Sequence, residues 1–145
     1  MYLLDTNVLS MLDGRHREFA RPLIGWMRRN TGVLHLSVIT VIELETGVLK
    51  IERQGASERS IKLRLFVDAM LHVFAGRLLV VDLETAHTAA RLGERALPTQ
   101  SGAADLLIAA TATVHGLTVL TRNIRHFRPT GVACLDPFDR LPPDA

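Results

Sequence analysis

The chain has 145 residues, of which 48% are hydrophobic and 22% are charged. This length and composition are typical of one globular domain, which we expect over residues 1–137, followed by a proline-rich C-terminal tail over 138–145. Seventeen basic and fifteen acidic side chains give a net charge of +2, which does not by itself indicate a nucleic-acid partner. Basic side chains nevertheless gather in 15–29 and 122–128, where either a solvated face or a phosphate-binding surface would explain them.

Three further classes of protein are disfavoured. Cys134 is the only cysteine, so no internal disulfide can form and a thiolate metal site lacks partners; we expect a small buried hydrophobe there. The apolar tract over 106–120 is interrupted by threonines, His115 and Gly116, which argues against a membrane span. The N-terminal apolar run has no basic stretch before it and ends at Asp5, so we expect no signal peptide and a cytoplasmic protein.

The first half of the chain alternates between strand and helix patterns. We predict a strand over 1–4, a helix over 8–12, a helix with Pro22 in its first turn, a strand over 35–37, a helix capped by Ser37 or Thr40 that ends near Gln54, and a helix that begins at Ser57.

The second half continues the alternation. We predict a strand over 78–81, a helix over 84–97 that Pro98 stops, a helix that begins at Asp105 and is closed by Gly116, a strand over 118–121 and a last strand over 132–135. Strands that alternate with helices from end to end predict a three-layer α/β/α fold with a central parallel sheet.

Three acids are predicted to reach one edge of that sheet. Asp5 ends the first strand, Glu43 lies about two turns into the helix after the second, and Asp105 opens the helix before the fourth. Right-handed crossovers bring such positions to the same edge. Clustered carboxylates repel one another, so a divalent cation stabilises them, and hard oxygen ligands favour Mg²⁺ or Mn²⁺ over zinc.

Each acid also has a purely structural interpretation. Asp5 and Asp105 could cap the helices that follow them, and for Asp105 taken alone the cap is the favoured interpretation. Glu43 follows Val41 and Ile42 in a largely apolar helix, although an exposed helix face would also accept it.

Four ordered blocks carry a family resemblance. They are Asp5-Thr6-Asn7-Val8-Leu9; Ser37-Val38-Ile39-Thr40 with Glu43-Leu44-Glu45-Thr46-Gly47; Asp105-Leu106-Leu107-Ile108-Ala109-Ala110-Thr111-Ala112; and Thr121-Arg122-Asn123 with His126-Phe127. Together they resemble the PIN-domain nucleases, most closely the VapC-type toxins of bacterial toxin–antitoxin pairs. The resemblance covers nearly the whole chain.

The resemblance implies a metal-dependent endoribonuclease that hydrolyses RNA phosphodiester bonds. Asp5, Glu43 and Asp105 would hold Mg²⁺ or Mn²⁺. Many family members have a fourth acid where this chain has Asn123, which offers a carbonyl oxygen but no charge, so a second metal ion is in question.

Four further side chains are candidates for substrate binding. Thr6 and Thr121 could orient carboxylates or waters, and Arg122 could stabilise charge on a phosphate. His126 stands where relatives often have Asp; it could meet a phosphate or remain exposed. The resemblance further implies a small VapB-like antitoxin that blocks the acids, and a homodimer or a heterotetramer or larger assembly with that antitoxin. The apolar helices over 38–71 support these partners only loosely, because the same faces could be core.

Two other functions remain open from the residues. A haloacid-dehalogenase-like phosphatase also places an aspartate after its first strand, but normally has a second acid two residues on, where this chain has Asn7. A catalytically silent RNA-binding PIN-like domain would share the fold; the three acids argue against it and Asn123 argues mildly for it. A nucleotide-binding module lacks its glycine-rich or phosphate-loop motif.

Overall fold

Five short parallel strands form the centre of the protein. The computed structural model describes residues 1–55, 57–97 and 102–145. The strands are β1 (Tyr2–Leu4), β2 (Leu34–Ser37), β3 (Leu78–Leu79), β4 (Thr118–Leu120) and β5 (Cys134–Leu135), and they lie in the order β3-β2-β1-β4-β5. Every neighbouring pair is parallel, with β1 between β2 and β4. The predicted central parallel sheet is confirmed.

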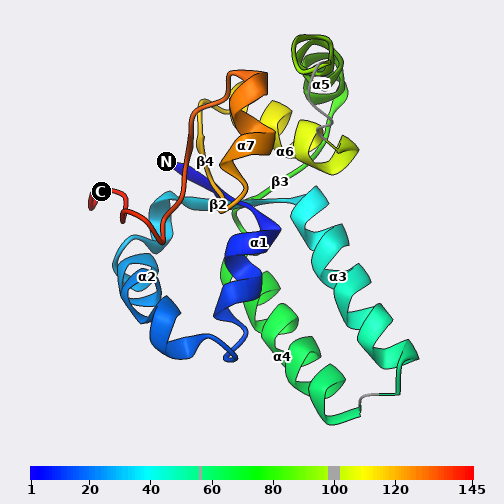
Figure 1. Cartoon of the computed structure of the whole chain (residues 1–145), viewed down its shortest axis with the longest axis vertical. Coiled ribbons are helices and arrows are strands. Elements are labelled where there is room, and N and C mark those ends of the chain that lie inside the picture. The colour runs from blue at the N-terminus through cyan, green and yellow to red at the C-terminus, as the bar shows by residue number, and fades with distance from the viewer. Residues whose placement is uncertain (56, 98–101) are drawn as a thin grey trace.

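Helices cover both faces of this sheet (Figure 1). They are α1 (Thr6–Leu9), α2 (Arg17–Arg29), α3 (Val38–Arg53), α4 (Ser57–Phe74), α5 (Leu83–Arg95), α6 (Ala103–Val114) and α7 (Ile124–Phe127). Single turns of 3-10 helix lie at Ser10–Leu12, Thr31–Val33 and Arg128–Thr130. No helix in the described part of the chain is long and apolar enough to cross a membrane.

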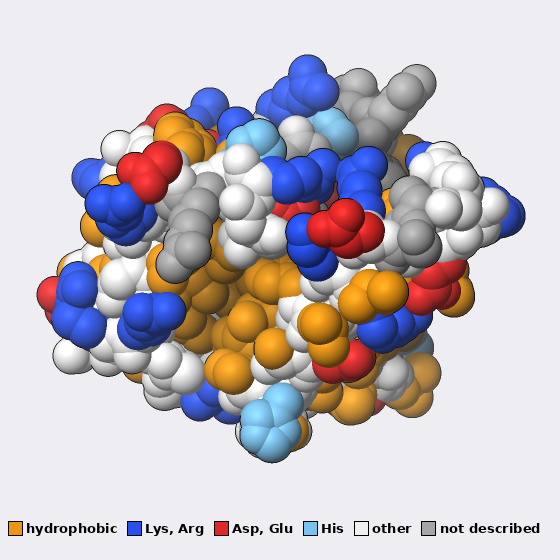
Figure 2. Space-filling model, turned by 90° about the horizontal axis from the view of Figure 1, so that it is seen from below, with side chains coloured by type: hydrophobic (Ala, Val, Ile, Leu, Met, Phe, Trp, Pro, Cys, Tyr) orange, Lys and Arg blue, Asp and Glu red, His pale blue; other side chains and the backbone are white. Residues whose placement is uncertain are grey.

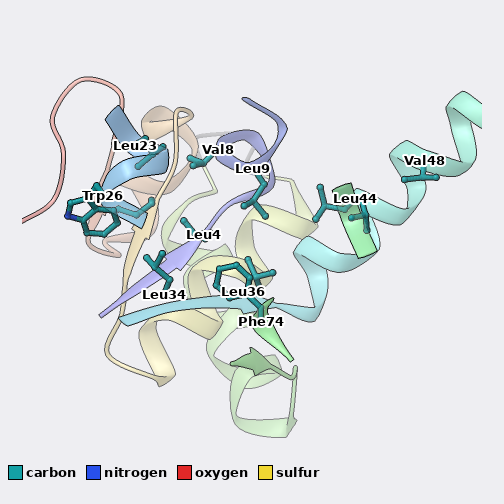
Figure 3. Packing of buried hydrophobic residues seen from close by; sticks show 12 residues of the cluster. Leu4, Val8, Leu9, Leu23, Trp26, Leu34, Leu36, Leu44, Val48 and Phe74 are labelled. Carbon is teal, nitrogen blue, oxygen red and sulfur yellow. The ribbon is translucent and has the colours of Figure 1, made fainter. Parts of the chain in front are cut away.

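Successive residues of β1 serve opposite layers, because side chains alternate across a strand. Leu4 packs with Leu36, Trp26 and Phe74 in the cluster drawn in Figure 3, which α2, α3 and α4 cover. Leu3 belongs to a second cluster with residues of α5, α6 and α7, such as Ile108. Both leucines are completely buried. The predicted three layers follow from this alternation.

The element boundaries differ from the predictions in identifiable ways. Pro22 lies inside α2 and does not begin it, so that prediction was wrong. The buried series Ala20, Leu23 and Trp26 extends the apolar face one turn upstream, and its burial favours the longer helix despite the missing proline N–H. The strands β3 and β5 are shorter than predicted, and the predicted helix stop at Pro98 lies outside the described residues.

The C-terminal segment packs against α2. The Phe138 ring stacks on Phe19 with their centroids 5.1 Å apart. Farther along, the buried Asn30 side chain donates to Asp144 Oδ1 at 2.7 Å and accepts from the Ala145 N–H at 2.8 Å. These contacts hold the end of the chain on the surface of the domain.

Candidate active site at the carboxyl edge of the sheet

The predicted acids lie beyond the carboxyl ends of the strands. Asp5 directly follows β1, Glu43 lies in α3 after β2, and Asp105 lies in the first turn of α6. Asp5 is only 4% exposed. The negative charges of Asp105 and Glu43 both act on the Asp5 carboxyl, so the three acids share one electrostatic environment. This is the edge at which open α/β sheets bind ligands.

Asp5 combines a capping role with its place in the acid cluster. Its Oδ1 accepts from the Thr6 N–H at 2.7 Å and so caps α1. Its Oδ2 accepts from the Thr121 hydroxyl at 2.7 Å, at the end of β4. Both oxygens therefore have fixed donors, and the carboxyl group is held in one orientation. The capping interpretation of Asp5 is correct, and it is compatible with the acid cluster.

Thr121 is the centre of this hydrogen-bond network. While its hydroxyl donates to Asp5, it accepts from Asn7 Nδ2 at 3.1 Å and from the Asn123 N–H at 2.9 Å. Asn7 Oδ1 also accepts from the Arg122 N–H at 3.0 Å. Thr121 is completely buried, so these bonds form away from water. They tie α1 to the loop after β4.

Burial dominates the electrostatics of Asp5. The pKa of Asp5 is raised from 3.8 to about 6. Desolvation is the main cause, the hydrogen bonds from Thr121 and Thr6 oppose it, and the negative charges of Asp105 and Glu43 add to it. An acid with a raised pKa beside two other acids favours binding a cation. Such a cation replaces the missing solvation and neutralises the repulsion.

The Glu43 side chain is oriented by a hydrogen bond from the turn that follows β1. Its Oε2 accepts a hydrogen bond from the hydroxyl of Thr6, the residue directly after Asp5. Ser37 caps α3 by accepting from the Ile39 N–H at 3.2 Å, whereas the buried Thr40 hydroxyl donates to the Leu4 carbonyl at 3.3 Å. The helix that carries Glu43 is thus fastened to the end of β1.

Asp105 does not cap its helix, so the favoured interpretation of this residue was wrong. The cap of α6 is Gly102, and Asp105 is the third residue of the helix. Ala103 and Ala104 are strong helix formers, which explains why the helix begins earlier. The Asp105 Oδ2 atom instead lies 2.8 Å from Nδ1 of His126 in α7. His126 is therefore neither fully exposed nor directed only at substrate.

The other candidate side chains lie around these acids. Arg122 Nη1 lies 3.1 Å from the Met11 sulfur, and its guanidinium group lies over the Phe138 ring at 5.6 Å. Asn123 precedes α7, and its side chain does not cap that helix. Roles for Arg122 in substrate binding and for Asn123 in catalysis stay predictions.

Sequence reasoning missed the structural roles of Asn7 and Thr40. The Asn7 side chain bonds Thr121 and Arg122, which lie more than 110 positions away in the sequence. The position of Asn7 in the Asp5-Thr6-Asn7 block was the sequence signal that could have indicated this role. Nothing in the local pattern marked the contact of Thr40 with Leu4, because it depends on how α3 packs on β1.

The donor set fits a hard divalent cation. All three acids supply carboxylate oxygens, the preferred ligands of Mg²⁺ and Mn²⁺. Among the described residues, no three His, Cys, Asp or Glu side chains form a ready-made metal cage. Magnesium sites seldom need one, because Mg²⁺ usually keeps several waters and binds one or two carboxylates together with substrate phosphates.

Comparison with known proteins agrees with this geometry. Residues 2–131 match the PIN domain family. The chain belongs to the PIN-domain family. It is 34% identical over 142 residues to VapC ribonuclease Y4jK of Sinorhizobium fredii, which covers 96% of this chain and 99% of that protein. It is 36% identical over 148 residues to Toxin FitB of Neisseria gonorrhoeae, at 95% and 99% coverage. The predicted resemblance to VapC-type PIN-domain toxins is confirmed.

Solved structures extend the match to three dimensions. The crystal structure of FitAcB from Neisseria gonorrhoeae superposes with a TM-score of 0.82 at 34% sequence identity, covering 95% of this chain and 99% of that chain. A toxin–antitoxin complex from Klebsiella pneumoniae has a TM-score of 0.64 at 23% identity and covers 94% and 98%, a likeness in fold alone. The predicted PIN-like fold is therefore confirmed over nearly the whole length of the PIN-domain chain.

Proposed function

We propose that this PIN-domain chain is a metal-dependent endoribonuclease and acts as the toxin of a toxin–antitoxin pair in the cytoplasm. The observation that carries the proposal is the buried Asp5, on whose carboxyl the charges of Asp105 and Glu43 act and whose pKa is raised to about 6. A purely structural acid is seldom kept desolvated beside like charges. The names of the relatives, VapC ribonuclease and Toxin FitB, support RNA as the substrate.

Mg²⁺ or Mn²⁺ would be held by Asp5, Glu43 and Asp105. When bound, the cation supplies charge neutralisation at the scissile phosphate and lowers the pKa of a coordinated water. The residues of the chain supply orientation. Thr121 and Thr6 fix the Asp5 and Glu43 carboxylates in advance, so little reorganisation is needed when RNA binds.

The remaining candidates would contact RNA around the acids. Arg122 follows Thr121 directly, and its backbone is fastened by Asn7, so a guanidinium group capable of binding phosphate starts from a fixed point beside Asp5. Asn123 adds no negative charge, which favours a single cation over a pair. The substrate-binding roles of Thr6, Thr121, Arg122 and His126 belong to this proposal.

A small antitoxin is the proposed protein partner, because a nuclease in the cytoplasm attacks the RNA of its own cell unless it is inhibited. A largely apolar groove of about 340 Å³ runs between α2 and α4 and offers a docking surface. Ile24, Met27, Phe66 and Met70 line it, with Arg28 beside them. Figure 2 shows hydrophobic side chains in a hollow of this face, with Lys and Arg around it. An apolar antitoxin segment that carries acids fits that surface.

We further propose that the chain forms a homodimer, or a heterotetramer or larger assembly with the antitoxin.

The proposal is tested by cleavage of purified RNA with Mg²⁺, with EDTA, and by the Asp5→Asn variant. We expect defined internal cleavage with Mg²⁺ only, and none from the variant. Cleavage that is unaffected by EDTA and by Asp5→Asn would contradict the proposal. RNA binding without cleavage under every condition would favour a silent RNA-binding domain. Hydrolysis of small phosphate monoesters, with RNA left intact, would favour the phosphatase.

A further inference from the structure

His126 and Asp105 form a contact that the nuclease proposal does not explain. His126 lies in α7 and Asp105 in α6, and the atoms His126 Nδ1 and Asp105 Oδ2 are 2.8 Å apart. A carboxylate can only accept hydrogen bonds, so the imidazole Nδ1–H is the donor. Both side chains are partly buried, at 32% and 21% exposure, which is enough to strengthen the bond over a fully solvated one.

Each of the three acids accepts a hydrogen bond that orients its carboxylate, but the donors lie in different parts of the fold. Asp5 accepts from Thr6 and Thr121, and Glu43 accepts from Thr6. These donors come from the β1–α1 turn and the end of β4. Asp105 is in a different layer, and His126 is the donor that bonds its carboxylate. Because the charges of Asp105 and Asp5 repel, an Asp105 side chain without a donor is expected to rotate toward solvent.

We propose that His126 is a positioning residue that holds the Asp105 carboxylate in the orientation needed for cation binding. The inference rests on the proposed metal-dependent function. With Oδ2 bonded to the imidazole, Oδ1 is the oxygen left to act as a ligand. Donors behind a metal ligand fix its orientation, and losing one typically weakens metal affinity by about 10- to 100-fold.

This role agrees with the residue types that follow Thr121 in this chain. The aspartate that relatives often have at position 126 would, when ionised, have no N–H or O–H to donate to Asp105, whereas the imidazole N–H of His126 does. Asn123 and His126 thus add hydrogen-bonding groups at the edge of the site without adding negative charge. The cation-binding charge is confined to Asp5, Glu43 and Asp105.

The test measures Mn²⁺ affinity of the full-length protein by calorimetry, in the wild type and in His126→Leu and His126→Asn. Leucine keeps a branched side chain but has no donor, whereas the asparagine amide places an N–H close to the position of Nδ1. We expect Mn²⁺ binding to weaken about 10-fold or more in His126→Leu and to stay within about 3-fold of wild type in His126→Asn. His126→Ala replaces His126→Leu if the leucine variant does not fold, with the same expected loss.

Two results would overturn the proposal. If His126→Leu binds Mn²⁺ as tightly as wild type while its KM for RNA rises, His126 acts on the RNA phosphate and does not position Asp105. If His126→Asn loses as much Mn²⁺ affinity as His126→Leu, the Nδ1 donor is not the cause. Failure of the wild type itself to bind Mn²⁺ would contradict the nuclease proposal, and so is distinguishable from both results.

Discussion

The acid edge of the sheet and the α3–α4 hairpin depart from ordinary protein structure in opposite ways. At the acid edge, polar side chains such as Asp5 and Thr121 are buried and bonded to one another. On the hairpin, apolar side chains lie in solvent. Ile42, Leu49, Ile61 and Leu65 are 59%, 58%, 60% and 63% exposed. Buried polar groups cost free energy unless they are hydrogen-bonded, and apolar side chains grouped in solvent can mark a surface that meets a partner.

The two regions are also stabilised differently. The acid edge is held by hydrogen bonds among residues far apart in the sequence, such as Asn7 and Thr121. In the hairpin, Arg64 of α4 donates to Glu45 of α3 at 2.5 Å and to Glu52 at 3.4 Å, so charged pairs join the two helices. We propose that the edge is arranged for chemistry and the hairpin for a partner surface.

The largest expected effect is on catalysis at the acid edge. Asp5→Asn removes a proposed metal ligand, and we expect cleavage of RNA to fall by at least about 100-fold, since even donors behind a ligand contribute 10- to 100-fold. Single-turnover cleavage rates at saturating Mg²⁺ measure the change. A retained rate would show that the burial of Asp5 serves only the cap of α1.

The second effect concerns pH. The pKa of Asp5 is raised from 3.8 to about 6, so the folded metal-free protein holds this proton more tightly than the unfolded chain does. The stabilisation is complete below about pH 4 and is lost as pH rises through about 6, by about 3 kcal/mol. Urea unfolding from pH 4 to 8 measures it. The Asp5→Asn variant should lack this part of the pH dependence; the same slope in both proteins would refute the assignment.

The third effect tests the hydrogen-bond network at the edge. Thr121→Val leaves the Asn7 side-chain amide and the Asn123 N–H without their acceptor, and we expect the free energy of unfolding to fall by about 2 kcal/mol. Thr111→Val is the matched control. Thr111 is equally buried, but its hydroxyl donates only to the Leu107 carbonyl of its own helix, so we expect about 0.5 kcal/mol or less. Equal losses in the two variants would mean that Thr121 merely fills space.

The smallest effect on folding is expected at the hairpin. Ile61 and Leu65 lie one turn apart on α4, and replacing both by Glu should change the free energy of unfolding by less than about 1 kcal/mol. Assembly should change instead, with at least about a tenfold loss in affinity for a second copy of the chain or for the proposed antitoxin. Light scattering and titration calorimetry measure the two. Unchanged assembly would show that this surface has no partner.

Much of the fold could be predicted because its pattern is local. The alternation of apolar runs with helical segments indicates parallel strands, and Asp5 after Tyr2–Leu4 marks the edge where the acids meet. Gly116, with a φ of 62°, ends α6 as its left-handed position predicts. These signals lie within a few residues of the structure that they determine.

The parts that could not be predicted depend on packing between distant segments. The contact of His126 with Asp105 exists because α7 lies beside α6, and neither residue shows it locally. The start of α2 upstream of Pro22 depends on the burial of Ala20. The prediction that Asp105 caps α6 was wrong because Ala103 and Ala104, which precede it, extend the helix.

The most direct test of the account is the position of Mn²⁺ in crystals of the wild-type protein, located by its anomalous scattering. We predict an ion bound by carboxylate oxygens of Asp5 and Asp105, with Glu43 near it directly or through water, and no such ion in Asp5→Asn crystals. An ion bound only elsewhere, or an unaltered ion in the variant, would contradict the assignment of the acid edge as the metal-binding centre.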